Sequence, residues 1–232
     1  MRKILCHSLL LFLTFLSSQV FTQPQNDAGL WLDVNVEKKI TQAFSVVFTE
    51  EMRMNENITE VGTVLTGLGL EYKFLKKFRV GVHYRYSNKR RLDDSYDNRH
   101  KWYLDVHYKE KIRPVTVILK LRYQSQYTDI YSSEKGEVSK DHLVPKITLK
   151  YDLKRKFEPY LYGEIYCIVG TRSEHKYNPG GEPLDQWRVC AGVEYSFNRM
   201  HMIDLHYLVN KEENVKDPVT SYVFGLSYYF TF

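Results

Sequence analysis

The feature that most restricts the fold is a regular alternation of hydrophobic residues over the end of the chain, Thr220–Phe232. Every second side chain from Tyr222 onward is large and apolar, and most residues between them are small or hydroxylated. Side chains on a strand point alternately to its two faces, so this segment is predicted to be a strand with one aromatic-aliphatic face. Such a face can cover a soluble core or contact acyl chains. A final strand that ends on an aromatic residue favours contact with the acyl chains of a membrane.

The same alternation recurs along the whole chain. The eleven segments that show it are 29–40, 43–55, 60–74, 78–89, 99–109, 114–126, 143–153, 158–169, 186–197, 201–212 and 220–232. Most reach the roughly 9–11 residues that a tilted strand needs to cross a bilayer. We therefore predict an all-β fold, an antiparallel up-and-down transmembrane β-barrel of about 10–12 strands. Because bacterial barrels have even strand numbers, ten or twelve is expected, with a short extra strand at 22–28 or one segment wrongly divided.

The connections between these segments alternate between two kinds. Short and usually basic connections lie at 38–42, 75–77, 110–113, 154–156 and 198–200, and longer ones lie at 90–98, 127–142, 171–185 and 213–219, with a brief member at 55–59. Short turns on one rim and long loops on the other are typical of an outer-membrane barrel with its turns in the periplasm. A soluble β-sandwich has no reason to alternate its connections in this way.

The N-terminus has the composition of a secretory signal peptide. A charged start, Met1–Lys3, precedes an apolar run at 4–18, and we expect cleavage after Thr22. The predicted division is a signal peptide at 1–22 and a barrel at 23–232. After the signal peptide, no apolar run approaches the roughly 18 residues of a membrane-spanning helix. Cleavage would remove the two basic residues of the signal peptide and lower the net charge from +5 to +3. A net charge of +3 is too small to indicate nucleic-acid binding.

The two faces of the segments have opposite chemistry. On the face taken as the outer one, aliphatic residues such as Leu119 and Leu205 lie at segment centres, and aromatic residues lie at segment ends. This is the pattern of a hydrocarbon band between two aromatic girdles. On the inner face, the predicted lumen charge network consists of Glu51, Arg53, Glu71, Arg79, Arg85, Asp105, Lys120, Arg122, Glu164, Arg188, Glu194, Asp204 and His206. Unpaired charges in a narrow interior are costly, so we expect ion pairs that hold the barrel shut, or a narrow polar solute path.

The best candidate for catalysis is the group of Asp204 and His206 on one segment with Ser227 on the next. These residue types can activate a hydroxyl nucleophile. All three are predicted to point inward, however, whereas a lipid-modifying barrel enzyme would need its nucleophile on the outer face. We therefore predict no catalytic residues, no metal site and no cofactor. A lipid-modifying enzyme is the alternative, and a soluble lipocalin-like periplasmic binder is a less favoured one.

Several stretches together resemble one family. They are Gly29–Ile40, Phe48–Ile58, Val82–Tyr96, Leu121–Tyr127 and the ending G-L-S-Y-Y-F-T-F. The chain is similar in these motifs to the outer-membrane barrels of domain of unknown function 2490, found mainly in Bacteroidota. The resemblance implies an outer-membrane location in a Gram-negative bacterium and carries no catalytic residues with it. The expected partners are outer-membrane lipids and the barrel-assembly machinery, which would recognise the C-terminal strand ending at Phe232. No nucleic acid is expected, and the oligomeric state stays open.

Overall fold

The computed structural model describes residues 25–90, 95–127, 139–153, 156–170, 182–214 and 218–232. The expected signal peptide at 1–22 lies outside these residues, as do large parts of the expected long loops. Within the described ranges, no helix is long and apolar enough to cross a membrane.

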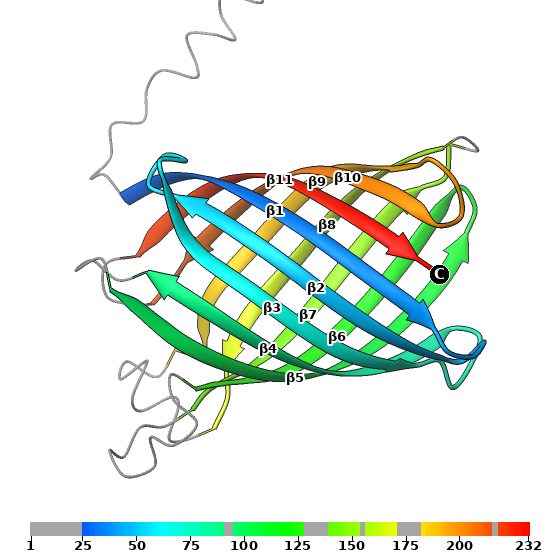
Figure 1. Ribbon diagram of the computed structural model, residues 1–232, viewed down its shortest axis with the longest axis horizontal. Coiled ribbons are helices and arrows are strands. Elements are labelled where there is room, and N and C mark those ends of the chain that lie inside the picture. The colour runs from blue at the N-terminus through cyan, green and yellow to red at the C-terminus, as the bar shows by residue number, and fades with distance from the viewer. Residues whose placement is uncertain (1–24, 91–94, 128–138, 154–155, 171–181, 215–217) are drawn as a thin grey trace, which may run out of the picture.

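Strands form one closed barrel (Figure 1). In chain order they are β1 (Gln25–Lys39), β2 (Phe44–Asn55), β3 (Glu60–Tyr72), β4 (Phe78–Arg90), β5 (Tyr96–Ile112), β6 (Val115–Tyr127), β7 (Lys140–Tyr151), β8 (Phe157–Ile168), β9 (Leu184–Ser196), β10 (His201–Glu212) and β11 (Val219–Thr231). Each overlaps one of the eleven segments that the alternation predicts. The predicted all-β barrel is therefore confirmed.

A parallel pair closes the barrel. Consecutive strands pair antiparallel, but β1 and β11 run in the same direction, from Gln25 opposite Val219 to Glu37 opposite Thr231. A wholly antiparallel barrel needs an even number of strands, whereas one parallel pair permits an odd number. The predicted range of 10–12 strands includes the observed eleven, but the expectation of an even number, ten or twelve, is wrong for this reason. Residues 25–28 extend β1 and do not form an extra strand.

The two ends of the barrel differ. β1 enters at one end, and β11 finishes at the other, where the C-terminus lies (Figure 1). We call the second end the short-turn rim and the first the long-loop rim. The described residues of the short-turn rim lie in and beside the turns at 38–43, 73–77, 110–114, 152–153, 156 and 197–200.

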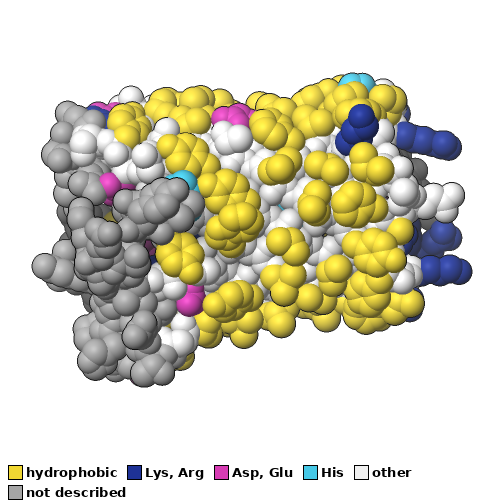
Figure 2. All heavy atoms as spheres, turned by 60° about the horizontal axis from the view of Figure 1, so that its bottom comes forward, with side chains coloured by type: hydrophobic (Ala, Val, Ile, Leu, Met, Phe, Trp, Pro, Cys, Tyr) yellow, Lys and Arg dark blue, Asp and Glu magenta, His cyan; other side chains and the backbone are white. Residues whose placement is uncertain are grey.

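The outer face of the wall is apolar. Side chains at segment centres, such as Leu205 at 60% and Leu119 at 44%, are exposed and are not covered by a second sheet. Figure 2 shows the hydrophobic side chains as a broad band between the two rims. Rings gather at the short-turn end of this band, where Phe78 lies 4.9 Å from Tyr108 between ring centres. The predicted assignment of the apolar face to the outside is confirmed.

Candidate functional site in the barrel interior

Asp105 and Arg122 form a two-point ion pair inside the wall. Strands β5 and β6 place them directly opposite each other, and Arg122 Nε and Nη2 donate to the two carboxylate oxygens at 2.7 and 2.8 Å. Only 2% of Asp105 is exposed. The guanidinium carbon also lies 3.9 Å from the centre of the Tyr103 ring. Two parallel hydrogen bonds and an aromatic face fix the orientation of Arg122.

Two histidines lie close to the same carboxylate. The Nε2 atoms of His83 and His107 lie 3.9 and 3.8 Å from Asp105 Oδ2. Two glycines leave the space that the His83 ring occupies, because a Cβ on Gly69 or Gly81 would overlap a nitrogen of that ring. These glycines therefore let the ring lie flat against the inner wall.

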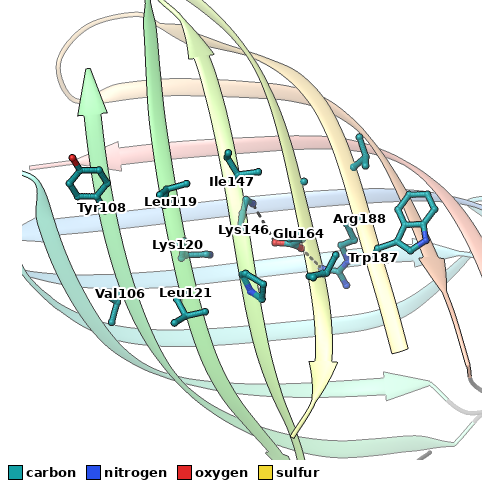
Figure 3. Close-up of a pocket in the computed structure, with 14 residues that line it drawn as sticks. Val106, Tyr108, Leu119, Lys120, Leu121, Lys146, Ile147, Glu164, Trp187 and Arg188 are labelled. Carbon is teal, nitrogen blue, oxygen red and sulfur yellow. Dashed lines mark hydrogen bonds and ion pairs between the residues drawn. The ribbon is translucent and has the colours of Figure 1, made fainter. Parts of the chain in front are cut away.

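A second chain of charges crosses three neighbouring strands. Glu164 of β8 lies between Lys146 of β7 at 3.6 Å and Arg188 of β9 at 3.2 Å, as the dashed lines in Figure 3 show. Lys120 of β6 is directly opposite Lys146 in the register. Among the described residues, no carboxylate lies within 4.0 Å of the Lys120 ammonium. The arrangement thus places two cations side by side with one acid shared by Lys146 and Arg188.

Other contacts reach over an intervening strand. Arg85 of β4 lies 3.8 Å from Glu51 of β2, and Lys150 of β7 donates to Glu194 of β9 at 2.5 and 2.6 Å. Other contacts of the expected network join residues of the same or the next strand: Arg53 with Glu51, Arg79 with Glu71 at 2.7 Å, and His206 with Asp204 at 3.1 Å. Side chains that bypass a strand span part of the interior, so they narrow the lumen as well as neutralise it.

An apolar cluster occupies another part of the interior. Cys190, Leu208 and Val223 of β9, β10 and β11 are almost wholly buried, with Leu208 at 0% exposure. Trp31 of β1 packs against them, and the Arg53 guanidinium carbon lies 3.9 Å from the centre of the Trp31 rings. The sequence interpretation did not find this cluster, because it assigned a polar character to the whole inner face. The available signal was the run Tyr207-Leu208-Val209, where the alternation stops.

The three candidate catalytic residues lie close together but do not form a nucleophile–base pair. Asp204 is opposite Ser227 in the register, and the His206 Nδ1 lies 3.1 Å from Asp204 Oδ2. The Ser227 hydroxyl, however, donates to Asp33 Oδ2 at 2.7 Å. His206 Nε2 faces Gly225, where an added Cβ would overlap the ring. The geometry gives no support to a role for Ser227 as nucleophile.

A further buried pair lies near the long-loop rim and was not singled out in the sequence. His142 Nε2 lies 2.9 Å from Asp185 Oδ2, and Lys140 Nζ lies 2.7 Å from the same oxygen. The sequence pattern assigns His142 and Asp185 to loops, but β7 and β9 extend far enough to include both. No group of three or more His, Cys, Asp or Glu side chains in the described part of the chain is suited to hold a metal ion.

The outer wall has a depression of about 780 Å³ across β5 to β9 (Figure 3). Its margins include the outward side chains of Leu119, Ile147 and Val189, whereas Pro145 and Gly163 have little bulk at outward positions. The β7–β8 register passes from Leu143–Cys167 to Lys146–Glu164 without a pair at Pro145. A proline has no backbone N–H to donate, which explains the local break in the ladder.

A closed barrel with an apolar exterior and a charged interior defines the outer-membrane β-barrel fold. Within this class, the chain belongs to the family described as protein of unknown function (DUF2490), whose model matches residues 28–220. This confirms the family that the sequence motifs resemble. No curated protein matches the chain in sequence.

Several solved barrels have a similar fold. LpxR from Salmonella typhimurium aligns with a TM-score of 0.50 at 8% identity, covering 81% of this chain and 83% of LpxR. The NanC porin has a TM-score of 0.48 at 10% identity over 79% of this chain and 86% of the porin. The β domain of the Bordetella autotransporter Brka has a TM-score of 0.45 at 9% identity over 84% and 86% of the two chains. At such identities, the likeness to LpxR concerns the fold alone.

Proposed function

We propose that the protein is an integral outer-membrane β-barrel whose interior is closed by its own side chains, so that it is a structural membrane element and not an open solute channel. The observation that carries this proposal is the filling of the interior. Ion pairs that bypass a strand, such as Lys150 with Glu194, lie inside the same wall as the buried apolar cluster at Leu208. A continuous water path would have to pass both groups.

The physical chemistry of the interior supports closure. A charge in a narrow interior with few water molecules is costly unless it is paired, and pairs with good geometry offset that cost. The fork between Asp105 and Arg122 meets this condition. Opening the lumen would require separating the pairs that bypass a strand, such as Lys150 with Glu194, so a closed state is the stable arrangement. The proposal assigns no catalytic activity, because the Ser227 hydroxyl is engaged by Asp33.

The proposed location and orientation in the membrane follow from the apolar band and the difference between the two rims. The apolar band lies in the hydrocarbon of the outer membrane of a Gram-negative bacterium, and the short-turn rim faces the periplasm. A signal peptide at 1–22 directs export, and the strand that ends at Phe232 presents its aromatic face to the barrel-assembly machinery. The exposed outward positions such as Leu205 and Phe224, and the rings near Phe232, support this placement.

Conductance in planar bilayers tests the closed interior. The refolded wild-type protein is expected to give no steady conducting state. A double variant, Trp31→Ala with Arg188→Ala, removes two large interior side chains whose Trp ring centre and guanidinium carbon lie 5.5 Å apart, and is expected to conduct. Leu205→Ala on the outer face is the matched control and should stay silent. Steady channels in the wild-type protein would overturn the proposal, provided that circular dichroism shows a folded barrel.

A further inference from the structure

The short-turn rim has a strong excess of positive charge. Its exposed basic residues are Lys38, Lys39, Lys73, Lys76, Lys77, Arg79, Lys109, Lys111, Arg113, Lys156 and Arg199, and the carboxylates beside them in the described ranges are Glu37, Glu71, Glu110, Asp152 and Glu158. Figure 2 shows Lys and Arg side chains that project from this end beyond the apolar band. Cations are present at all five turns, so they surround the rim and do not form a patch on one side.

The long-loop rim has the opposite character. In its described part, the acidic residues are Asp27, Glu56, Glu60, Asp97, Asp141, Glu182, Asp185, Glu212 and Glu213, and the basic ones are Lys89, Arg90, Arg99, Lys140 and Lys211. The charge is therefore separated along the barrel axis. Solubility requires only an even scatter of both charge signs over the surface. It therefore does not explain a separation of positive and negative charge between the two rims.

Internal pairing neutralises only part of the basic rim. Lys77 donates to Glu110 at 2.6 Å, a bond that raises the pKa of Lys77, and Lys111 lies 2.9 Å from Asp152. The exposed cations without a carboxylate within 4.0 Å, among the residues that the structure describes, include Lys39, Lys73, Lys76, Arg113 and Arg199. Each of these five projects into solvent at the rim and can meet an external anion.

The rim cations lie next to aromatic side chains. Lys38 Nζ is 5.5 Å from the centre of the Phe232 ring, and Phe74 beside Lys73 lies 5.6 Å from Phe78 between ring centres. Aromatic rings in this position mark the boundary between hydrocarbon and headgroups. Lysine and arginine stems extend from that boundary toward water. Their charged ends thus lie at the level of lipid phosphates.

We propose that the short-turn rim binds the phosphates of anionic phospholipid headgroups in the adjoining leaflet. This inference rests on the proposed membrane embedding and adds a lipid class to it. Basic residues beside an anionic membrane surface each strengthen binding about fivefold, and the effect falls off within a Debye length. Unpaired cations at several turns would therefore enrich anionic lipid around this end of the barrel, while the acidic long-loop rim would not.

The test uses spin-labelled lipids with the full mature chain reconstituted in phosphatidylcholine vesicles. Spin-labelled phosphatidylglycerol is expected to associate several-fold more than spin-labelled phosphatidylcholine, and added NaCl should reduce the difference. The rim variant replaces Lys39, Lys73, Lys76, Arg113 and Arg199 by Gln and is expected to lose most of the preference. The matched control, Glu56→Gln with Glu182→Gln, changes exposed charges at the other rim and should keep it.

Three results would overturn the inference, and they differ in whether the membrane embedding survives. If the protein floats with the vesicles but shows no preference for phosphatidylglycerol, or if the rim variant keeps the full preference, the rim does not bind headgroup phosphates and the embedding still stands. If the folded protein does not float with the vesicles, the embedding itself fails and the headgroup site fails with it. Heat-modifiable mobility on gels identifies variants that have not folded. If the rim variant with its five Gln substitutions does not fold, variants with one of these substitutions each take its place.

Discussion

Replacing Arg122 by alanine should destabilise the barrel much more than removing an exposed rim cation. The substitution leaves Asp105, which is 2% exposed, without the two hydrogen bonds that now satisfy its carboxylate oxygens. Removing one partner of a buried ion pair costs about 3–5 kcal/mol, because the other charge stays buried and unpaired. Loss of the Arg122 contact with the Tyr103 ring adds about 0.5–2 kcal/mol.

The measurement is urea unfolding of the protein refolded in vesicles, followed by tryptophan fluorescence. Arg122→Ala is expected to lower the free energy of unfolding by about 3.5–7 kcal/mol, the sum of these two effects. The double variant Asp105→Asn with Arg122→Met removes both charges and should lose less than the single variant. Lys77→Ala, which breaks the exposed pair with Glu110, serves as control and should leave the midpoint unchanged.

The comparison of the single and double variants shows whether the ion pair between Asp105 and Arg122 stabilises the barrel. If Arg122→Ala unfolds at the same urea concentration as Lys77→Ala, the Asp105 carboxylate is not held in a dry interior. If the double variant is as unstable as the single one, the loss comes from packing and not from an unpaired charge. Either result would refute a stabilising role for the ion pair between β5 and β6.

Three further predictions concern other parts of the wall. Gly225→Ala should cost about 1–3 kcal/mol by overpacking against the His206 ring, and His206→Ala in the same chain should restore most of the loss in urea titrations. Leu205→Arg on the outer face should cost about 2–4 kcal/mol in vesicles, because the charge would enter the hydrocarbon, whereas Leu205→Val should be nearly neutral. His206→Ala alone should leave lipid A and phospholipid profiles of the producing cells unchanged, and an altered profile would favour the lipid-modifying enzyme.

Much of the wall could be predicted from single residues, because the face of each side chain depends only on its parity along the strand. This is why Leu205 and Asp204 could be assigned to opposite faces. The alternation also marked eleven segments, but it could not show that an odd number of strands closes into a barrel. Closure depends on how β1 meets β11, a pairing between residues about as far apart as the chain allows, and no local pattern distinguishes a parallel from an antiparallel closure.

The contacts inside the barrel depend on register and tilt, which alternation does not determine. Glu51 contacts both Arg53 on its own strand and Arg85 two strands away, and only the second contact requires knowledge of the closed shape. The apolar cluster was missed for a different reason. Parity places Leu208 on the inner face, but that face was taken as polar throughout, and the contact of Leu208 with Cys190 and Val223 depends on the register of β9, β10 and β11.

The parallel seam has a topological consequence for peptides fused to the barrel. β1 and β11 run side by side in the same direction, so the chain enters the wall at one rim and leaves it at the other. An epitope tag joined before Gln25 and one joined after Phe232 would then be displayed on opposite sides of the membrane. In a barrel closed by an antiparallel pair, both tags would share one compartment.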